Sequence, residues 1–296
     1  MIKLKIGIPR GLFYYYFSDL WINFFEYLGF SVVISPKTNK EILALGIKYS
    51  NDEMCISLKN YIGHVLYLKD KVDYILVPRI DNYGCDNQTC TNFLALFDII
   101  NNLIDTKILN YNINLLNGET EYLGLLKIGK ELKISKNKIK EAYQFALKRA
   151  NKIRDSKISK NINKLNSKKV KILLVGHSYN IHDELISRDI KDILKKLDVE
   201  IICADIFYDS SSYEKLCPGL YFKYSKVLVS SIVDFIDNVD GIIFLSVFPC
   251  GVDSLVNELV IRKIDKPNIN LVIDDNFISG GIETRLESFI DVINSR

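Results

Sequence analysis

Three cysteines share a sequence context that favours metal binding. Cys55, Cys90 and Cys250 each lie in a predicted loop or just beyond a predicted strand, shortly before a predicted helix. Backbone N–H groups at a helix N-terminus lower the pKa of a thiol, and the thiolate is the form that binds metal. Thiolates select zinc or iron–sulfur clusters, and the wide spacing without a CxxC pair is unlike a zinc ribbon or finger. We predict that the three sulfurs converge on one metal centre.

The segment 242–255 gives the clearest local signal. A nearly continuous apolar run, typical of a buried parallel strand, leads to Cys250. Gly251 follows, and we expect Asp253 or Ser254 to cap the next helix. Open α/β sheets hold their ligands at the carboxyl ends of strands, so this cysteine stands where a ligand is expected.

The other three cysteines have weaker contexts. Cys85 shares a predicted loop with Cys90 and is the better candidate for a further ligand. Cys217 is a second such candidate. Cys203 falls inside a predicted strand, which favours a place in the core. A different interpretation also stays open, in which the cysteines are small buried hydrophobic residues and bind nothing.

The remaining polar candidates are isolated in the sequence. His64 and His177 follow glycines, and His177 lies just past a predicted strand, yet a structural role is expected for each and also for His182. Asp274-Asp275 could bind a cation at a strand end or cap a turn before Gly280-Gly281. The chain has no P-loop, no GxGxxG and no nucleophile elbow.

Composition excludes several classes of protein. The 296 residues are 48% hydrophobic and 25% charged, which is typical of a globular protein with room for two domains. A net charge of +3, from 39 basic and 36 acidic residues, does not indicate a nucleic-acid partner. No apolar segment reaches the roughly 18 residues of a membrane span, and no signal peptide is evident. We expect a cytoplasmic protein, and in that reducing compartment six cysteines favour metal or redox chemistry over a disulfide framework.

The first half alternates between strand and helix patterns. Thr38 with Glu41 forms a capping box for one predicted helix, and Gly46 is expected to end that helix. Strands are predicted at 2–8, 30–34, 73–79 and 106–110, with helices at 19–28, 38–45, around 59–68 and at 93–103. Such alternation favours a parallel sheet with helices on both faces.

The same pattern restarts after a polar stretch. Residues 120–150 are helical in pattern, and 148–169 are rich in Lys, Asn and Ser, which indicates a hinge. Strands follow at 170–176, 199–204, 241–247 and 270–273, with helices at 183–197, 221–236, 254–264 and 282–293. We predict an α/β protein with two Rossmann-like (flavodoxin-like) parallel-sheet domains, 1–118 and 170–296, joined by a helical, Lys-rich linker, 119–169.

Several segments together form a recognisable combination: Ile6–Leu12, Pro36–Gly46, Cys55–Lys59 with Gly63-His64, Val72–Arg79, Gly176–Asp183, Phe248–Glu258 and Thr284–Asp291. This combination resembles the acyl-CoA dehydratase activase-related proteins, relatives of the 2-hydroxyacyl-CoA dehydratase and benzoyl-CoA reductase subunits. The resemblance covers both predicted domains and is weakest over the linker.

The resemblance implies a cofactor and partners. It implies a [4Fe-4S] cluster held between the two domains, with Cys55, Cys90 and Cys250 at the matching positions, and hence oxygen sensitivity. Some relatives hold a double-cubane cluster, for which Cys85 and Cys217 would be the further thiolates. Electrons in this superfamily come from a separate ATP-hydrolysing iron–sulfur activator protein. A second copy of the chain or a related subunit is a further partner, whereas nucleic acid and membrane are not expected.

The neighbours of the cysteines depart from the family pattern. Ser57 stands where a proline is usual, Thr91 replaces the proline of a Cys-Pro pair, and Val252 replaces the proline of Cys-Gly-Pro-Asp-Ser. Asn276 stands where the family has a histidine after two acidic residues. Two functions follow. One is a dehydratase-like or reductase-like enzyme that passes low-potential electrons to a small substrate, such as an acyl-CoA. The other is a non-catalytic accessory or cluster-scaffold subunit.

Overall fold

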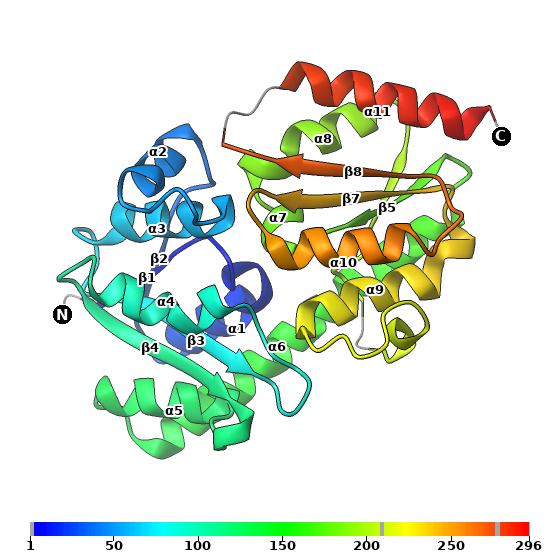
Figure 1. Cartoon of the computed structure of the whole chain (residues 1–296). Coiled ribbons are helices and arrows are strands. Elements are labelled where there is room, and N and C mark those ends of the chain that lie inside the picture. Colours follow the sequence, from blue (N-terminus) through cyan, green and yellow to red (C-terminus); the bar gives the residue numbers. More distant parts are fainter. Residues whose placement is uncertain (1–2, 208–209, 276–278, 296) are drawn as a thin grey trace. The chain divides into compact units, whose positions relative to one another are not determined.

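The computed structural model describes residues 3–207, 210–275 and 279–295. The chain forms two compact units (Figure 1), and each contains one four-stranded parallel sheet. Unit 1 comprises Met1–Asp52, Ser57–Arg154 and Tyr221–Lys223, and unit 2 comprises Glu53–Ile56, Asp155–Leu220 and Tyr224–Arg296. The predicted fold class is therefore confirmed. The short segment that carries Cys55 groups with the second half of the chain.

The sheet of unit 1 has the strand order β2-β1-β3-β4, with all neighbours parallel. Its strands are β1 (Lys5–Ile8), β2 (Ser31–Ile34), β3 (Tyr74–Asn82) and β4 (Lys107–Asn114), and its helices are α1 (Tyr14–Tyr27), α2 (Lys40–Lys48), α3 (Ile56–Leu68), α4 (Thr91–Asn101) and α5 (Glu121–Glu131). The inner strands are almost entirely buried, which explains why they read as apolar runs.

Unit 2 repeats this order as β6-β5-β7-β8. Its strands are β5 (Lys171–Val175), β6 (Glu200–Cys203), β7 (Gly241–Val247) and β8 (Asn268–Ile273), and its helices are α7 (Ser178–Ile181), α8 (Glu184–Lys196), α9 (Lys223–Phe235), α10 (Gly251–Ile261) and α11 (Ser279–Asn294). In Figure 1, α8 and α11 lie together on one face of this sheet and α9 and α10 on the other. The strand order reverses direction between β5 and β7, and this is the point where such sheets bind ligands.

Two expected helix boundaries are wrong for tertiary reasons. Asn39, not Thr38, is the N-cap of α2, and its side chain accepts the N–H of Ile42. Thr38 instead contacts a buried histidine described below. Gly46 does not end α2 but lies within it, because its missing side chain lets α2 approach the backbone of α3.

The predicted linker is helical, and its long helix α6 (Lys136–Asn163) ends against the sheet of unit 2. The side-chain amide of Asn161 donates to the carbonyl of Cys203 at 2.9 Å and accepts its N–H at 3.0 Å. Asn161 is buried and thus pairs the backbone at the outer edge of β6, as another strand would.

We expect Asn161→Leu to lower the free energy of unfolding by about 3 kcal/mol, because it leaves a buried N–H and carbonyl of β6 without partners. Urea unfolding followed by circular dichroism measures this loss. Asn163→Leu, at an exposed position of the same helix, is the matched control and should change stability little. Equal effects of the two variants would contradict the edge-pairing role.

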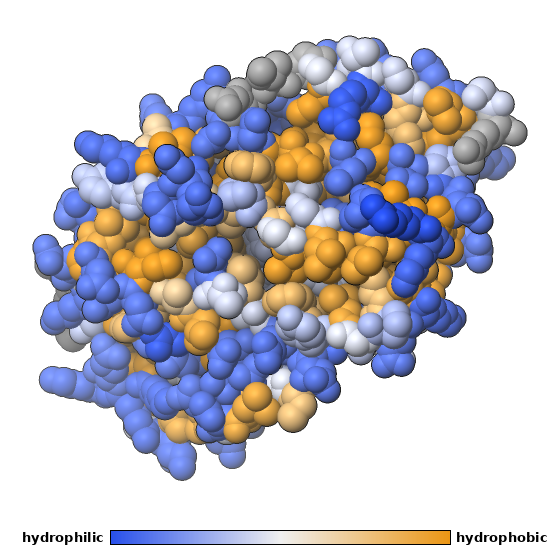
Figure 2. All heavy atoms as spheres, in the orientation of Figure 1, coloured by the Kyte–Doolittle hydropathy of each residue, from blue (hydrophilic) through white to orange (hydrophobic). Residues whose placement is uncertain are grey.

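The helices differ in how much apolar surface they expose. Among the described residues, no helix combines the length and the apolar character needed to cross a bilayer. Figure 2 shows apolar side chains over α10, where Leu255 and Leu259 are 63% and 43% exposed.

Candidate functional site

The three candidate cysteines stand directly at helix N-termini, as predicted. Cys250 is the N-cap residue of α10, Cys90 is the N-cap residue of α4, and Cys55 immediately precedes α3. All three are half-buried. Their helices begin earlier than the sequence pattern indicated, so each cysteine lies closer to the helix end than expected.

Cys250 caps its own helix. It follows β7, and its Sγ accepts the backbone N–H of Asp253 at 3.5 Å. The expectation that Asp253 or Ser254 caps this helix is therefore wrong. Asp253 is the third residue of α10, so Cys250 and Asp253 have the spacing of a capping box, in which the third helical residue pairs with the N-cap residue. This spacing could have identified Cys250 as the N-cap from the sequence.

Cys55 and Cys250 belong to the same unit and lie near each other. The N–H of Ile56 donates to the carbonyl of Phe248 at 3.3 Å, which ties the residue after Cys55 to the loop that carries Cys250. The charge of Cys55 also raises the pKa of the Cys250 thiol, as expected for two neighbouring sulfurs. The structure thus brings together two of the three cysteines at the carboxyl end of β7.

Cys90 belongs to unit 1, and the convergence of its sulfur with the other two stays a prediction. Within the described ranges, no group of three or more His, Cys, Asp or Glu side chains lies close enough to hold a metal ion.

The expectation of a low pKa is wrong for Cys250. Burial raises the pKa of its thiol well above the ordinary range, and the charge of Asp253 raises it further. The backbone N–H of Asp253 acts in the opposite direction but does not prevail. In the metal-free protein this thiol therefore stays protonated at neutral pH, and a bound cation would be needed to stabilise its thiolate.

A buried histidine–aspartate pair lies beside Cys250, and sequence reasoning missed it. His177 Nε2 is 2.9 Å from Asp253 Oδ1, and both side chains are 8% exposed. The His177 ring stacks on Tyr179 with 5.0 Å between ring centroids. Gly176 lets the loop after β5 come this close to β7, since a β-carbon there would lie 2.6 Å from the carbonyl oxygen of Leu245. The pair therefore joins the ends of β5 and β7, where the strand order reverses.

A second pair lies at the end of β6. His182 Nε2 is 2.9 Å from Asp205 Oδ2, and Ser178 Oγ donates to the same oxygen at 2.5 Å. Asp205 is buried, with a side chain 4% exposed, whereas that of His182 is 32% exposed.

The other candidates take structural positions. His64 is fully buried in α3, with Nε2 3.0 Å from Thr38 Oγ1, as its structural interpretation predicted. Cys203 is buried at the end of β6, also as predicted. Cys217 packs into the apolar core of unit 2, and burial raises its pKa, so its local setting does not favour a ligand. Cys85 is exposed in the loop between β3 and α4.

The predicted acidic site near the C-terminal end is only partly described. Asp274-Asp275 are exposed after β8, and Asn276 lies outside the described residues. Gly280-Gly281 belong to α11, and residues 276–278, where a turn before these glycines was expected, lie outside the described residues.

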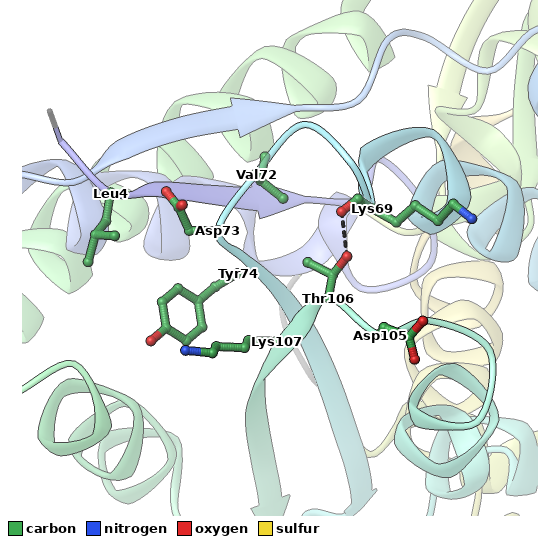
Figure 3. A pocket seen from close by; sticks show the side chains of 8 residues that line it. All are labelled: Leu4, Lys69, Val72, Asp73, Tyr74, Asp105, Thr106 and Lys107. Atoms are coloured by element: carbon green, nitrogen blue, oxygen red, sulfur yellow. Dashed lines mark hydrogen bonds between the residues drawn. The ribbon is translucent and has the colours of Figure 1, made fainter.

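A surface pocket of about 480 Å³ lies elsewhere in unit 1 (Figure 3). Its lining residues stand at the amino ends of β1, β3 and β4, opposite the ends where parallel sheets bind ligands. Asp73 already accepts the N–H of Lys5 at 2.7 Å, and Thr106 donates to the carbonyl of Lys69. The polar groups of this pocket therefore hold strand ends together, and we exclude it from the candidate site.

Comparison with known families identifies the family of the chain. The family described as CoA enzyme activase uncharacterised domain (DUF2229) matches residues 5–207. The chain belongs to this family. The range matched to the CoA enzyme activase domain includes Cys55, Cys90 and His177, and it ends before Cys250 and Asp253. No curated protein matches the chain.

Proposed function

We propose that this CoA enzyme activase-related protein is an iron–sulfur protein that passes low-potential electrons to a small substrate of the acyl-CoA class. Cys55, Cys90 and Cys250 would hold a [4Fe-4S] cluster. One observation carries the proposal. Cys55 and Cys250, from distant parts of the chain, lie near each other at the N-termini of α3 and α10, beside the point where the strand order of unit 2 reverses.

The donor set fits such a cluster chemically. Thiolates are the usual ligands of iron–sulfur clusters, and N–H groups directed at the sulfurs stabilise their negative charge. Cys250 already accepts one such N–H, and its half-buried position limits contact with water. Such a cluster, when bound, would supply single-electron transfer to a substrate. The protein's residues hold the sulfurs and fix the surrounding hydrogen bonds.

The partners follow from the family. A CoA enzyme of the dehydratase type is the partner that the family description supports best. An ATP-hydrolysing iron–sulfur activator would supply the electrons. A second copy or related subunit would cover the exposed Leu255 and Leu259 of α10. An oxygen-sensitive cluster agrees with the cytoplasmic location expected from the sequence.

Purification without oxygen tests the proposal. We expect a brown protein with about four iron atoms and about four sulfides per chain. Cys55→Ser and Cys250→Ser should each lose most of this iron, because each removes one of the thiolate ligands. Cys203→Ala, which changes a buried cysteine of β6, is the control and should keep the iron. Wild-type protein without iron would overturn the proposal.

Acyl-CoA binding then separates the enzyme from an accessory subunit. Isothermal titration of the iron-loaded protein with a short-chain acyl-CoA should show saturable, stoichiometric binding. Iron that exchanges readily with a chelator, together with no acyl-CoA binding, would assign the protein to cluster storage or delivery instead.

A further inference from the structure

We infer that Asp253 and His177 together set the reduction potential of the cluster proposed at Cys250, a role that rests on the proposed function. Asp253 would place one hydrogen bond and one negative charge at the ligand sulfur. His177 would act as the positioning residue that fixes this carboxylate.

The first step of the argument is the double contact of Asp253. Its backbone N–H donates to Cys250 Sγ at 3.5 Å, while its side chain is buried in the same turn of α10. The two parts of one residue thus act in opposite senses on the sulfur. The N–H stabilises negative charge at the sulfur, and the carboxylate disfavours it.

The second step is the anchoring of Asp253 by His177. The 2.9 Å contact joins two buried side chains that come from the ends of two neighbouring strands, β5 and β7. The His177 ring is itself held by stacking on Tyr179 and by an edge contact with Tyr224, with centroids 6.4 Å apart. His177 is therefore a rigid support, and it holds the Asp253 carboxylate in the first turn of α10, the turn that Cys250 caps.

The third step gives the direction in which Asp253 shifts the reduction potential. Reduction adds one electron, and hence one negative charge, to a cluster and its sulfurs. A buried carboxylate nearby disfavours that charge and lowers the potential. Asp253→Asn keeps the shape, the backbone N–H and an oxygen that accepts from His177 Nε2, but removes the charge. The midpoint potential should therefore rise.

The experiment is a potentiometric titration of the anaerobically purified protein, followed by optical and electron paramagnetic resonance spectra. We expect Asp253→Asn to move the midpoint to higher potential with unchanged iron content. Asp205→Asn is the matched control, because Asp205 is an equally buried carboxylate with the same 2.9 Å contact to a histidine. Its midpoint should equal that of the wild type.

A double-mutant cycle tests the part played by His177. His177→Phe keeps a ring against Tyr179 and removes the nitrogen that contacts Asp253. If His177 positions the carboxylate, the shift caused by Asp253→Asn is smaller in the His177→Phe background than in the wild type. Additive shifts would overturn the positioning role.

Iron and sulfide contents are measured first in every sample. Wild-type protein that lacks iron overturns the proposed function and this inference together. Iron-loaded Asp253→Asn with the wild-type midpoint overturns the inference alone, as does an equal shift in Asp205→Asn.

Discussion

Gly63→Ala is expected to lower the free energy of unfolding of unit 1 by about 3 kcal/mol, near the upper end of what overpacking usually costs. A β-carbon at Gly63 would lie 1.9 Å from the carbonyl oxygen of Ile42 in α2. The obstacle is backbone and not a flexible side chain, so α2 and α3 would have to move apart. Gly46 of α2 approaches α3 in the same way, since a β-carbon there would lie 1.8 Å from the carbonyl oxygen of Lys59.

Urea unfolding of the variant, followed by far-ultraviolet circular dichroism, measures this effect. Gly281→Ala in α11 is the matched control, because alanine favours a helix by about 1 kcal/mol. Apart from the adjoining residues and the backbone of α11 itself, no atom of the described residues lies within 4 Å of the added carbon. The two variants should therefore move the unfolding midpoint in opposite directions. A Gly63→Ala midpoint at or above that of the wild type would show that α2 and α3 do not pack this closely.

Acid should destabilise the protein through His64. Burial, and secondly the charge of Arg10, lower the pKa of His64 from its usual 6.5 to about 3. Because the folded pKa lies below the unfolded one, the unfolded chain takes up the proton first. The stability that neutral His64 contributes is complete above about pH 6.5 and is lost progressively as the pH falls towards 3. At pH 5 the loss from this one residue should be about 2 kcal/mol.

His64→Gln provides the comparison. Its amide nitrogen occupies the place of Nε2 near Thr38 Oγ1 and does not titrate. Urea midpoints of the wild type and the variant, measured at about pH 7 and about pH 5, should differ more in the wild type. Other titrating groups affect both proteins alike and cancel in the comparison. Parallel pH dependence of the two proteins would contradict a neutral, buried His64.

The architecture was predictable because it depends on local patterns. Buried parallel strands read as apolar runs, and β7 was predicted with the bounds that it has in the structure, Gly241–Val247. Strands alternating with helices then leave few topologies other than two parallel sheets. Helix starts were less predictable. Thr38 reads as a cap, but its hydroxyl contacts His64, 26 residues away, and Asn39 takes its place.

The candidate site was predictable only in part. The position of each cysteine before a helix follows from the sequence nearby. The contact between His177 and Asp253 joins residues 76 apart and depends on the order of the strands, which no local pattern contains. The raised pKa of Cys250 was missed for a similar reason, since burial, its main cause, comes from tertiary packing.

The path of the chain has a practical consequence for dissecting this protein. Glu53–Ile56 group with unit 2 although the rest of that unit begins at Asp155. A gene fragment that starts at the hinge would therefore encode Cys250 but not Cys55. Unit 2 obtained in this way lacks the Cys55 sulfur that lies near Cys250. A C-terminal fragment that fails to retain iron therefore does not show that the intact chain cannot bind iron.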